Sequence, residues 1–203
     1  YIKLFKIMSN LAHIQPDYDN IFEKSNEKQW SISLKRGKNS LSLFKVDRNG
    51  EIFDLELLYN RSFRQNKSQY SSYSLSLKPD YTIRIKKGFN IFLIHFDAKY
   101  RSDVLLDDNN INERDKEEDE KRIYKYADIY KMHTYKDAIK GSLGAYVLYP
   151  GSESKIFKEK PPKKLPSVGA FPLTPGRDNL NEESEIEKFI KDVLDYINVL
   201  WNV

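Results

Sequence analysis

The chain has 203 residues and a net charge of +4, with 32% charged and 13% aromatic residues. This length and aromatic content favour a single folded domain over residues 1–203 and argue against disorder. The absence of cysteine excludes a disulfide scaffold, a cysteine-ligated zinc site and a thiol nucleophile. No apolar run approaches the roughly 20 residues that span a bilayer, so we expect a cytoplasmic protein that does not enter a membrane. The opening Tyr1-Ile2-Lys3-Leu4 is neither a signal peptide nor a translation start, and we expect a fragment whose beginning is missing.

The charge is unevenly distributed along the chain. Residues 107–122 hold eight acidic and four basic residues, a local charge of −4 within a net charge of +4, so the rest of the chain carries +8. A basic body with one acidic segment suits a polyanionic partner such as nucleic acid. An AT-rich genome, which encodes many lysine and asparagine residues, would explain the same excess without such a partner.

The N-terminal half combines one helical pattern with several strand patterns. Apolar residues at helical spacing predict a helix over residues 1–14, which ends before Pro16. Period-two alternation predicts two strands joined by a turn at 36–39, and the Asn49-Gly50 pair predicts a hairpin into the next strand. The polar stretch 61–72 predicts a loop. The strands are predicted over residues 30–34, 41–46, 52–59, 73–77, 81–86 and 89–99.

The C-terminal half combines two predicted helices with a short strand and loops. Residues 107–120, almost without apolar side chains, predict a mobile loop or the solvated start of a helix. The stretches 155–164 and 166–176 contain proline and glycine and predict loops. A short buried strand is predicted over 145–149 and a last helix over 182–200. A helix is also predicted over 123–139, with its inner positions at Ile123, Ala127, Tyr130, Tyr135 and Ala138. This order indicates an α/β or α+β sheet with helices packed on it.

A carboxylate and an ammonium group stand two residues apart at the end of the strand predicted over 89–99. Asp97 and Lys99 therefore project from one face of that strand. Burial of these charges without a partner is costly, which favours a cleft where a cation and a phosphate bind. The same face carries Ile91, Leu93 and His95, and we expect His95 to pack against apolar neighbours rather than to bind a ligand.

Asp80 follows Pro79 beside the neighbouring strand, where it can meet Asp97. Two converging carboxylates are hard oxygen ligands for Mg²⁺ or Mn²⁺, with the backbone carbonyl of Ala98 as a third ligand. Such a cation polarises a phosphodiester and lowers the pKa of a bound water, and Lys99 would hold that water or help to deprotonate it. The alternatives are a turn aspartate at position 80 and a lysine that extends to solvent at position 99.

The segments Pro79-Asp80 and Asp97-Ala98-Lys99 resemble the motif of the PD-(D/E)xK nuclease superfamily. The hairpin between them, the following helix and the strand in residues 144–151 stand in the order of that superfamily. The resemblance implies an α/β restriction-endonuclease-like core, a mixed central sheet flanked by helices, with an extra N-terminal β-hairpin. It also implies a metal-dependent DNA endonuclease whose catalytic residues are Asp80, Asp97 and Lys99.

Residues 130–139 and 168–173 resemble a bacterial branch found beside McrB-type GTPases in modification-dependent restriction systems. This resemblance implies the cleaving subunit of a defence system with an McrB-like GTPase or AAA+ partner. Because cleavage of both strands needs two sites, we expect a homodimer on DNA.

Four further residues are candidates for contacts with DNA. Tyr100 and Arg101 follow the strand that carries Lys99, and Tyr130 and His133 lie on the predicted helix. His133 is equally compatible with packing in the core.

A glutamate on the first core helix often supplies another metal ligand in the superfamily. The predicted first helix has no acidic residue, so that glutamate lies upstream of Tyr1 or is replaced by Glu56, which more often would be an outward-facing strand position. Two other functions remain open. One is a nuclease-like module that only binds DNA or scaffolds a complex. The other is a different Mg²⁺-dependent phosphotransfer enzyme, which the lack of a GxxxxGK[ST] loop disfavours.

Overall fold

A seven-stranded sheet of order β3-β4-β5-β6-β7-β9-β8 forms the centre of the protein. The computed structural model describes residues 1–18, 21–24, 32–34, 42–65, 71–99, 116–151, 153–158, 165–173 and 184–201. The strands of the main sheet are β3 (Ser42–Arg48), β4 (Glu51–Tyr59), β5 (Tyr81–Lys87), β6 (Asn90–Ala98), β7 (Ser142–Tyr149), β8 (Lys155–Lys158) and β9 (Ser167–Pro172). A separate two-stranded sheet pairs β1 (Phe22–Lys24) with β2 (Ile32–Leu34).

The direction of strand pairing changes at β6. The strands from β3 to β6 run antiparallel to their neighbours, whereas β6, β7 and β9 pair in parallel. The helix α2 (Lys116–Ala138) lies in the connection between the parallel strands β6 and β7, as parallel pairing requires. The sheet is therefore mixed and flanked by helices, which confirms the predicted fold class.

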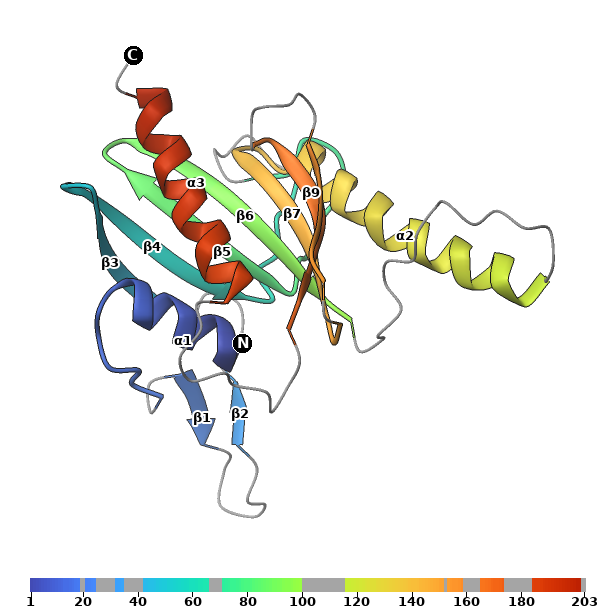
Figure 1. Ribbon diagram of the computed structural model, residues 1–203, viewed down its shortest axis with the longest axis horizontal. Coiled ribbons are helices and arrows are strands. Elements are labelled where there is room, and N and C mark those ends of the chain that lie inside the picture. The colour runs from blue at the N-terminus through green and yellow to red at the C-terminus, as the bar shows by residue number, and fades with distance from the viewer. Residues whose placement is uncertain are drawn as a thin grey trace.

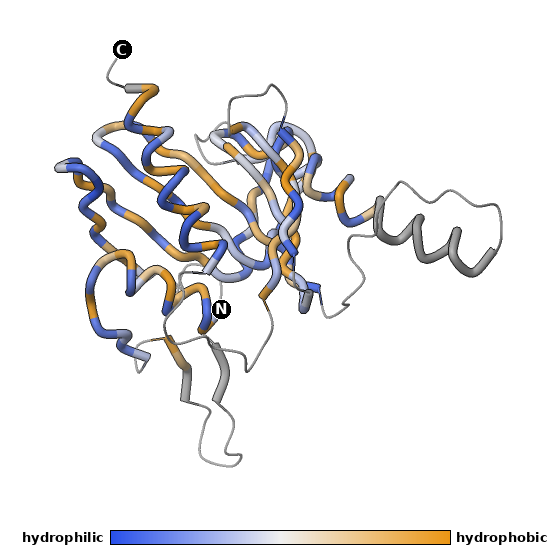
Figure 2. The backbone as a smooth tube through the Cα atoms, in the orientation of Figure 1, coloured by the Kyte–Doolittle hydropathy of each residue, from blue (hydrophilic) through white to orange (hydrophobic). Residues whose placement is uncertain are grey.

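Helices lie on both faces of the sheet (Figure 1). α1 (Ile2–Leu11) and α3 (Glu185–Trp201) pack on one face, against side chains such as Phe53 and Leu55 of β4. The C-terminal part of α2 packs on the other face, where Met132 joins Leu93 and Val147 in a second apolar cluster. Polar and apolar segments alternate along α3 in Figure 2, as expected of a helix with one face against a sheet. No helix in the described ranges is long and apolar enough to cross a membrane.

The hairpin predicted at Asn49-Gly50 forms between β3 and β4, whereas the strand predicted over residues 30–34 has a different partner. Residues 30–34 do not pair with 41–46 within the described part of the chain, because β2 pairs with β1 and β3 pairs with β4. Asn49 and Gly50 have φ angles of 57° and 81°, the left-handed conformation that a tight hairpin requires. This turn, together with the buried Phe44 and Val46, directs β3 to β4. The turn predicted at 36–39 lies outside the described residues.

Three other predictions were wrong. Residues 73–77 form no strand, and only an isolated bridge joins Leu77 to Phe63. The predicted loops 155–164 and 166–176 contain β8 and β9. Gly169 misled the prediction because it does not mark a turn. A Cβ at this position would collide with the backbone carbonyl of Lys155, so glycine here lets β8 lie close to β9.

Candidate active site

The carboxylate of Asp97 is buried at the C-terminal end of β6, with 2% of its side chain exposed. Alternation along β6 places it on the same face as Leu93 and His95, the face on which α2 packs. A buried carboxylate requires charged or hydrogen-bonding partners. Its partners are Lys99, which directly follows β6, and Lys131 of α2.

Lys99 lies beside Asp97, as the two-residue spacing predicted. Its Nζ is 2.8 Å from Oδ2 of Asp97, and 23% of its side chain is exposed. The backbone N–H of Lys99 donates to the carbonyl of Leu148, 2.8 Å away. This bond to β7 fixes the backbone that carries the ammonium group.

Asp80 immediately precedes β5, which pairs with β6 from Tyr81 opposite Phe96. Its Oδ2 accepts a hydrogen bond of 2.8 Å from the backbone N–H of Ala98. The Asp80 carboxylate is therefore held against the residue between Asp97 and Lys99, where one of its oxygens is already engaged.

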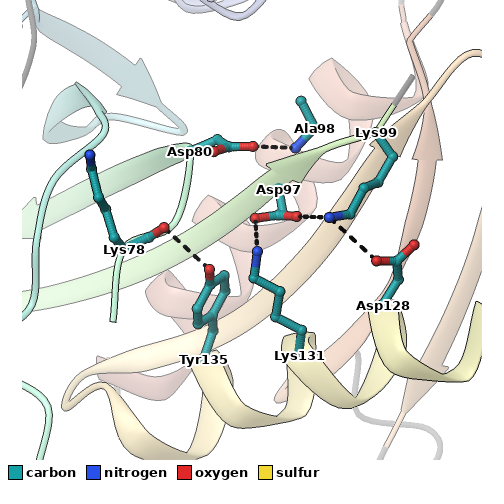
Figure 3. Close-up of polar contacts among 8 residues, drawn as sticks. All are labelled: Lys78, Asp80, Asp97, Ala98, Lys99, Asp128, Lys131 and Tyr135. Carbon is teal, nitrogen blue, oxygen red and sulfur yellow. Dashed lines mark hydrogen bonds and ion pairs between the residues drawn. The ribbon is translucent and has the colours of Figure 1, made fainter. Parts of the chain in front are cut away.

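Three residues of α2 complete the cluster, and sequence reasoning missed them as site residues (Figure 3). The Nζ of Lys131 donates to Oδ1 of Asp97 at 2.7 Å. An oxygen of Asp128 lies 3.3 Å from the Nζ of Lys99. The hydroxyl of Tyr135 donates to the backbone carbonyl of Lys78 at 3.2 Å.

The spacing of these three residues in the sequence could have identified them as neighbours on α2. Asp128, Lys131 and Tyr135 stand three and four residues apart, which places them on one helix face. Of the predicted inner positions, Tyr135 and Ala138 are buried, whereas Ala127 and Tyr130 are exposed. Polar and aromatic residues occur on every face of this helix, so the pattern alone does not identify the buried side.

The ammonium groups of Lys99 and Lys131 share the Asp97 carboxylate. Partial burial lowers the pKa of Lys131, but the hydrogen bond and charge of Asp97 outweigh it, and the pKa is raised well above its ordinary value. The pKa of Lys99 is raised in the same way: burial opposes the shift, while Asp97 and Asp128 cause it. Both side chains therefore carry a positive charge at neutral pH.

His95 lies one alternate position before Asp97 and is fully buried. Its ring packs edge-on against Phe63 and Tyr135, and its Nδ1 is 2.9 Å from Oγ1 of Thr82. Burial lowers the pKa of His95 to about 3. It is a neutral packed histidine, as expected.

Among the described residues, the other candidates are not brought to Asp97. Glu56 forms an ion pair with Arg84, which in turn stands opposite Leu93, four residues before Asp97. His133 and Tyr130 are exposed on α2. Tyr100 and Arg101 lie outside the described residues.

Two carboxylates, Asp80 and Asp97, are the ligands that the site offers to a metal. The described residues contain no group of three or more His, Asp or Glu side chains arranged to bind one. Two observations nevertheless fit a divalent cation. The Asp97 oxygens already hold two positively charged nitrogens, at 2.7 and 2.8 Å. The donor atoms are also the hard oxygens that Mg²⁺ and Mn²⁺ prefer.

Comparison with known proteins agrees with this arrangement. Residues 1–154 match a family model described as PD-(D/E)XK nuclease superfamily. No curated protein and no solved structure matches the chain. The matched region runs from α1 past β7 and contains all the residues that surround Asp97. The chain belongs to the PD-(D/E)XK nuclease superfamily.

Proposed function

We propose that the protein is a divalent-metal-dependent endonuclease that hydrolyses phosphodiester bonds of DNA. The observation that carries the proposal is the buried Asp97 with the Lys99 ammonium 2.8 Å away and the Asp80 carboxylate bonded to the intervening Ala98. A fold alone does not need a buried carboxylate with two ammonium groups at a strand end, because apolar residues would pack there at lower cost.

The metal is Mg²⁺ or Mn²⁺, held by Asp80, Asp97 and the backbone carbonyl of Ala98. When bound, such a cation supplies Lewis acidity to the phosphate and to the attacking water. The rest of the chemistry belongs to this chain. Lys99 orients the water through its ammonium group and neutralises charge that develops on the phosphate. Lys131, whose ammonium group pairs with Asp97 at 2.7 Å, would be placed to contact a phosphate oxygen.

The wider role that we propose rests on resemblance. The protein is the cleaving subunit of a bacterial defence system, works in the cytoplasm with an McrB-like GTPase or AAA+ partner, and dimerises on DNA. Residues 130–139 support this branch, and Tyr130 and His133 are exposed on α2, where DNA could reach them. Stimulation of plasmid cleavage by a purified McrB-type GTPase with GTP tests it. Unchanged cleavage would contradict the partnership without affecting the nuclease assignment.

The nuclease assignment is tested by plasmid cleavage with Mg²⁺ or Mn²⁺. Asp97→Asn and Lys99→Met should each abolish cleavage while retaining the folded far-UV circular dichroism spectrum and DNA binding. The matched control is Lys45→Met, which makes the same chemical change at a lysine that is 82% exposed on β3. It should cleave like the wild type.

The other outcomes are equally informative. Equal cleavage by all three variants would show that Asp97 and Lys99 are not catalytic. Intact DNA binding without cleavage by any protein, with or without the GTPase, would favour the alternative function, an inactive nuclease-like module that binds DNA.

A further inference from the structure

The connection between β4 and β5 is unusually long and ends at the candidate active site. It joins Tyr59 to Tyr81, whereas most connections in compact domains have about 4–6 residues and those above about 12–15 are commonly functional. Its two ends meet, because the N–H of Asn60 donates to the carbonyl of Asp80 at 2.8 Å. The segment therefore leaves the sheet and returns at the same point, beside the candidate metal ligand.

The charge of this connection has one sign. Residues 60–79 contain four basic residues and no acidic residue, in a chain with 30 Asp and Glu residues. Arg64 and Lys78 are exposed, and Arg61 is half-buried. In Figure 3 the Lys78 side chain extends away from the Asp97 carboxylate rather than pairing with it. A uniformly positive segment that adjoins a nuclease site matches the charge of a nucleic-acid backbone.

The described part of the connection is anchored at several points. Phe63 and Leu77 exchange backbone hydrogen bonds of 2.8 and 3.0 Å. The N–H of Tyr73 donates to the carbonyl of Ala138 at 3.0 Å, and the N–H of Lys140 donates to the carbonyl of Ser71 at 3.1 Å. These bonds fix residues 71–77 against the C-terminal end of α2.

Two apolar side chains on this anchored stretch face solvent. Tyr73 is 61% exposed and Leu75 is 68% exposed. Tyr73, Leu75 and Leu77 alternate with serines. Of these three side chains, Leu77 packs against the core, whereas the other two do not. An aromatic ring can meet the face of a nucleic-acid base only where that base is unstacked, as in a single strand or an opened duplex.

We infer that residues 60–65 and 71–79 form a DNA-binding surface that guides an unpaired strand to the active site. Tyr73 stacks on an unstacked base, Leu75 packs against the same nucleotide, and Arg64 and Lys78 contact phosphates. The inference rests on the proposed function, which it deepens by naming a single-stranded or locally opened substrate.

Fluorescence anisotropy with a labelled DNA single strand, and with the matching blunt duplex, tests the inference. EDTA prevents metal-dependent cleavage, so the readout does not depend on whether the chain cuts DNA. Tyr73→Ala should weaken binding of the single strand about tenfold, whereas Tyr73→Phe should retain it because the ring remains. The duplex should be affected less than about threefold. Arg64→Ala should reduce the salt dependence for both DNAs by about one counterion.

The matched control is Phe89→Ala. Phe89 is 99% exposed in the turn between β5 and β6, at the opposite end of β6 from Asp97, and its loss should leave binding unchanged. The inference is overturned if the wild type does not bind the single strand, or if Tyr73→Ala binds it like the wild type or like Phe89→Ala. Plasmid cleavage alongside that result would leave the proposed function standing. If binding depends on Tyr73 but no plasmid is cleaved, the inference stands and the proposed nuclease activity is rejected.

Discussion

Replacement of Lys131 by methionine tests whether the α2 ammonium is truly coupled to Asp97. The Nζ lies 2.7 Å from Oδ1 of Asp97, whose side chain is 2% exposed, while that of Lys131 is 42% exposed. At an effective dielectric constant of about 20, two unit charges at this distance attract by roughly 6 kcal/mol. Desolvation of the carboxylate and solvent around the lysine offset most of this attraction. Exposed pairs contribute about 0–1 kcal/mol, and loss of one partner of a fully buried pair costs about 3–5 kcal/mol.

We therefore expect a coupling free energy of about 2 kcal/mol between Lys131 and Asp97. The sign of the effect should depend on the background. Lys131→Met should destabilise the wild type by about 1–2 kcal/mol, but it should be neutral or stabilising in Asp97→Asn, where Lys99 and Lys131 repel each other without a carboxylate between them. The pKa of Lys131 is raised in the folded protein. The stability that Lys131 contributes is therefore constant below the unfolded pKa of about 10.4. It is lost only as the pH rises through the native pKa.

The coupling is measured by urea unfolding of the wild type, Lys131→Met, Asp97→Asn and the double variant. Unfolding is followed by circular dichroism between pH 6 and 9. Lys45→Met is the control, because the Lys45–Asp54 pair spans 3.7 Å on the exposed side of the sheet and should contribute less than about 0.5 kcal/mol. A coupling free energy for Lys131 and Asp97 as small as this control would refute the reasoning.

Three further predictions concern stability, each measured by urea unfolding. Burial lowers the pKa of His95 to about 3, so the protein is stabilised by the neutral imidazole above the unfolded pKa of about 6.5 and loses this stability as the pH falls. Between pH 7 and 5 the free energy of unfolding of the wild type should fall by about 2 kcal/mol more than that of His95→Gln. Arg48→Ala removes a bidentate pair with Asp195 of α3, at 2.9 and 2.7 Å, and should cost about 1 kcal/mol, with no loss if the pair does not form. Gly144→Ala places a Cβ against the buried Tyr146 side chain and 2.9 Å from the carbonyl of Ser167 and should cost about 2 kcal/mol; a neutral effect would show that these neighbours can move apart.

The parts of the fold that could be predicted are those decided locally. The period of two and the Asn49-Gly50 turn locate β4 and its hairpin, and the spacing of Asp97 and Lys99 places them on one face before any neighbour is known. Their partners could not be predicted in the same way. Lys131 faces Asp97 because α2 packs on β6 and β7 in one rotation, and that rotation depends on contacts distant in the sequence. β9 could not be predicted for a similar reason. Gly169 lets β8 lie close to β9, and this contact exists only in the folded sheet.

The change of direction at β6 also bears on when the site forms during folding. β3–β4 and β5–β6 are hairpins closed by tight turns, so they can pair soon after collapse. β6 and β7 pair only after the long crossover through α2 has closed, which carries a larger entropic cost. Asp80 precedes the first strand of one hairpin, whereas Lys131 arrives with the crossover. The charged cluster is therefore complete only in the fully folded chain, and an incompletely folded one would lack the assembled cluster.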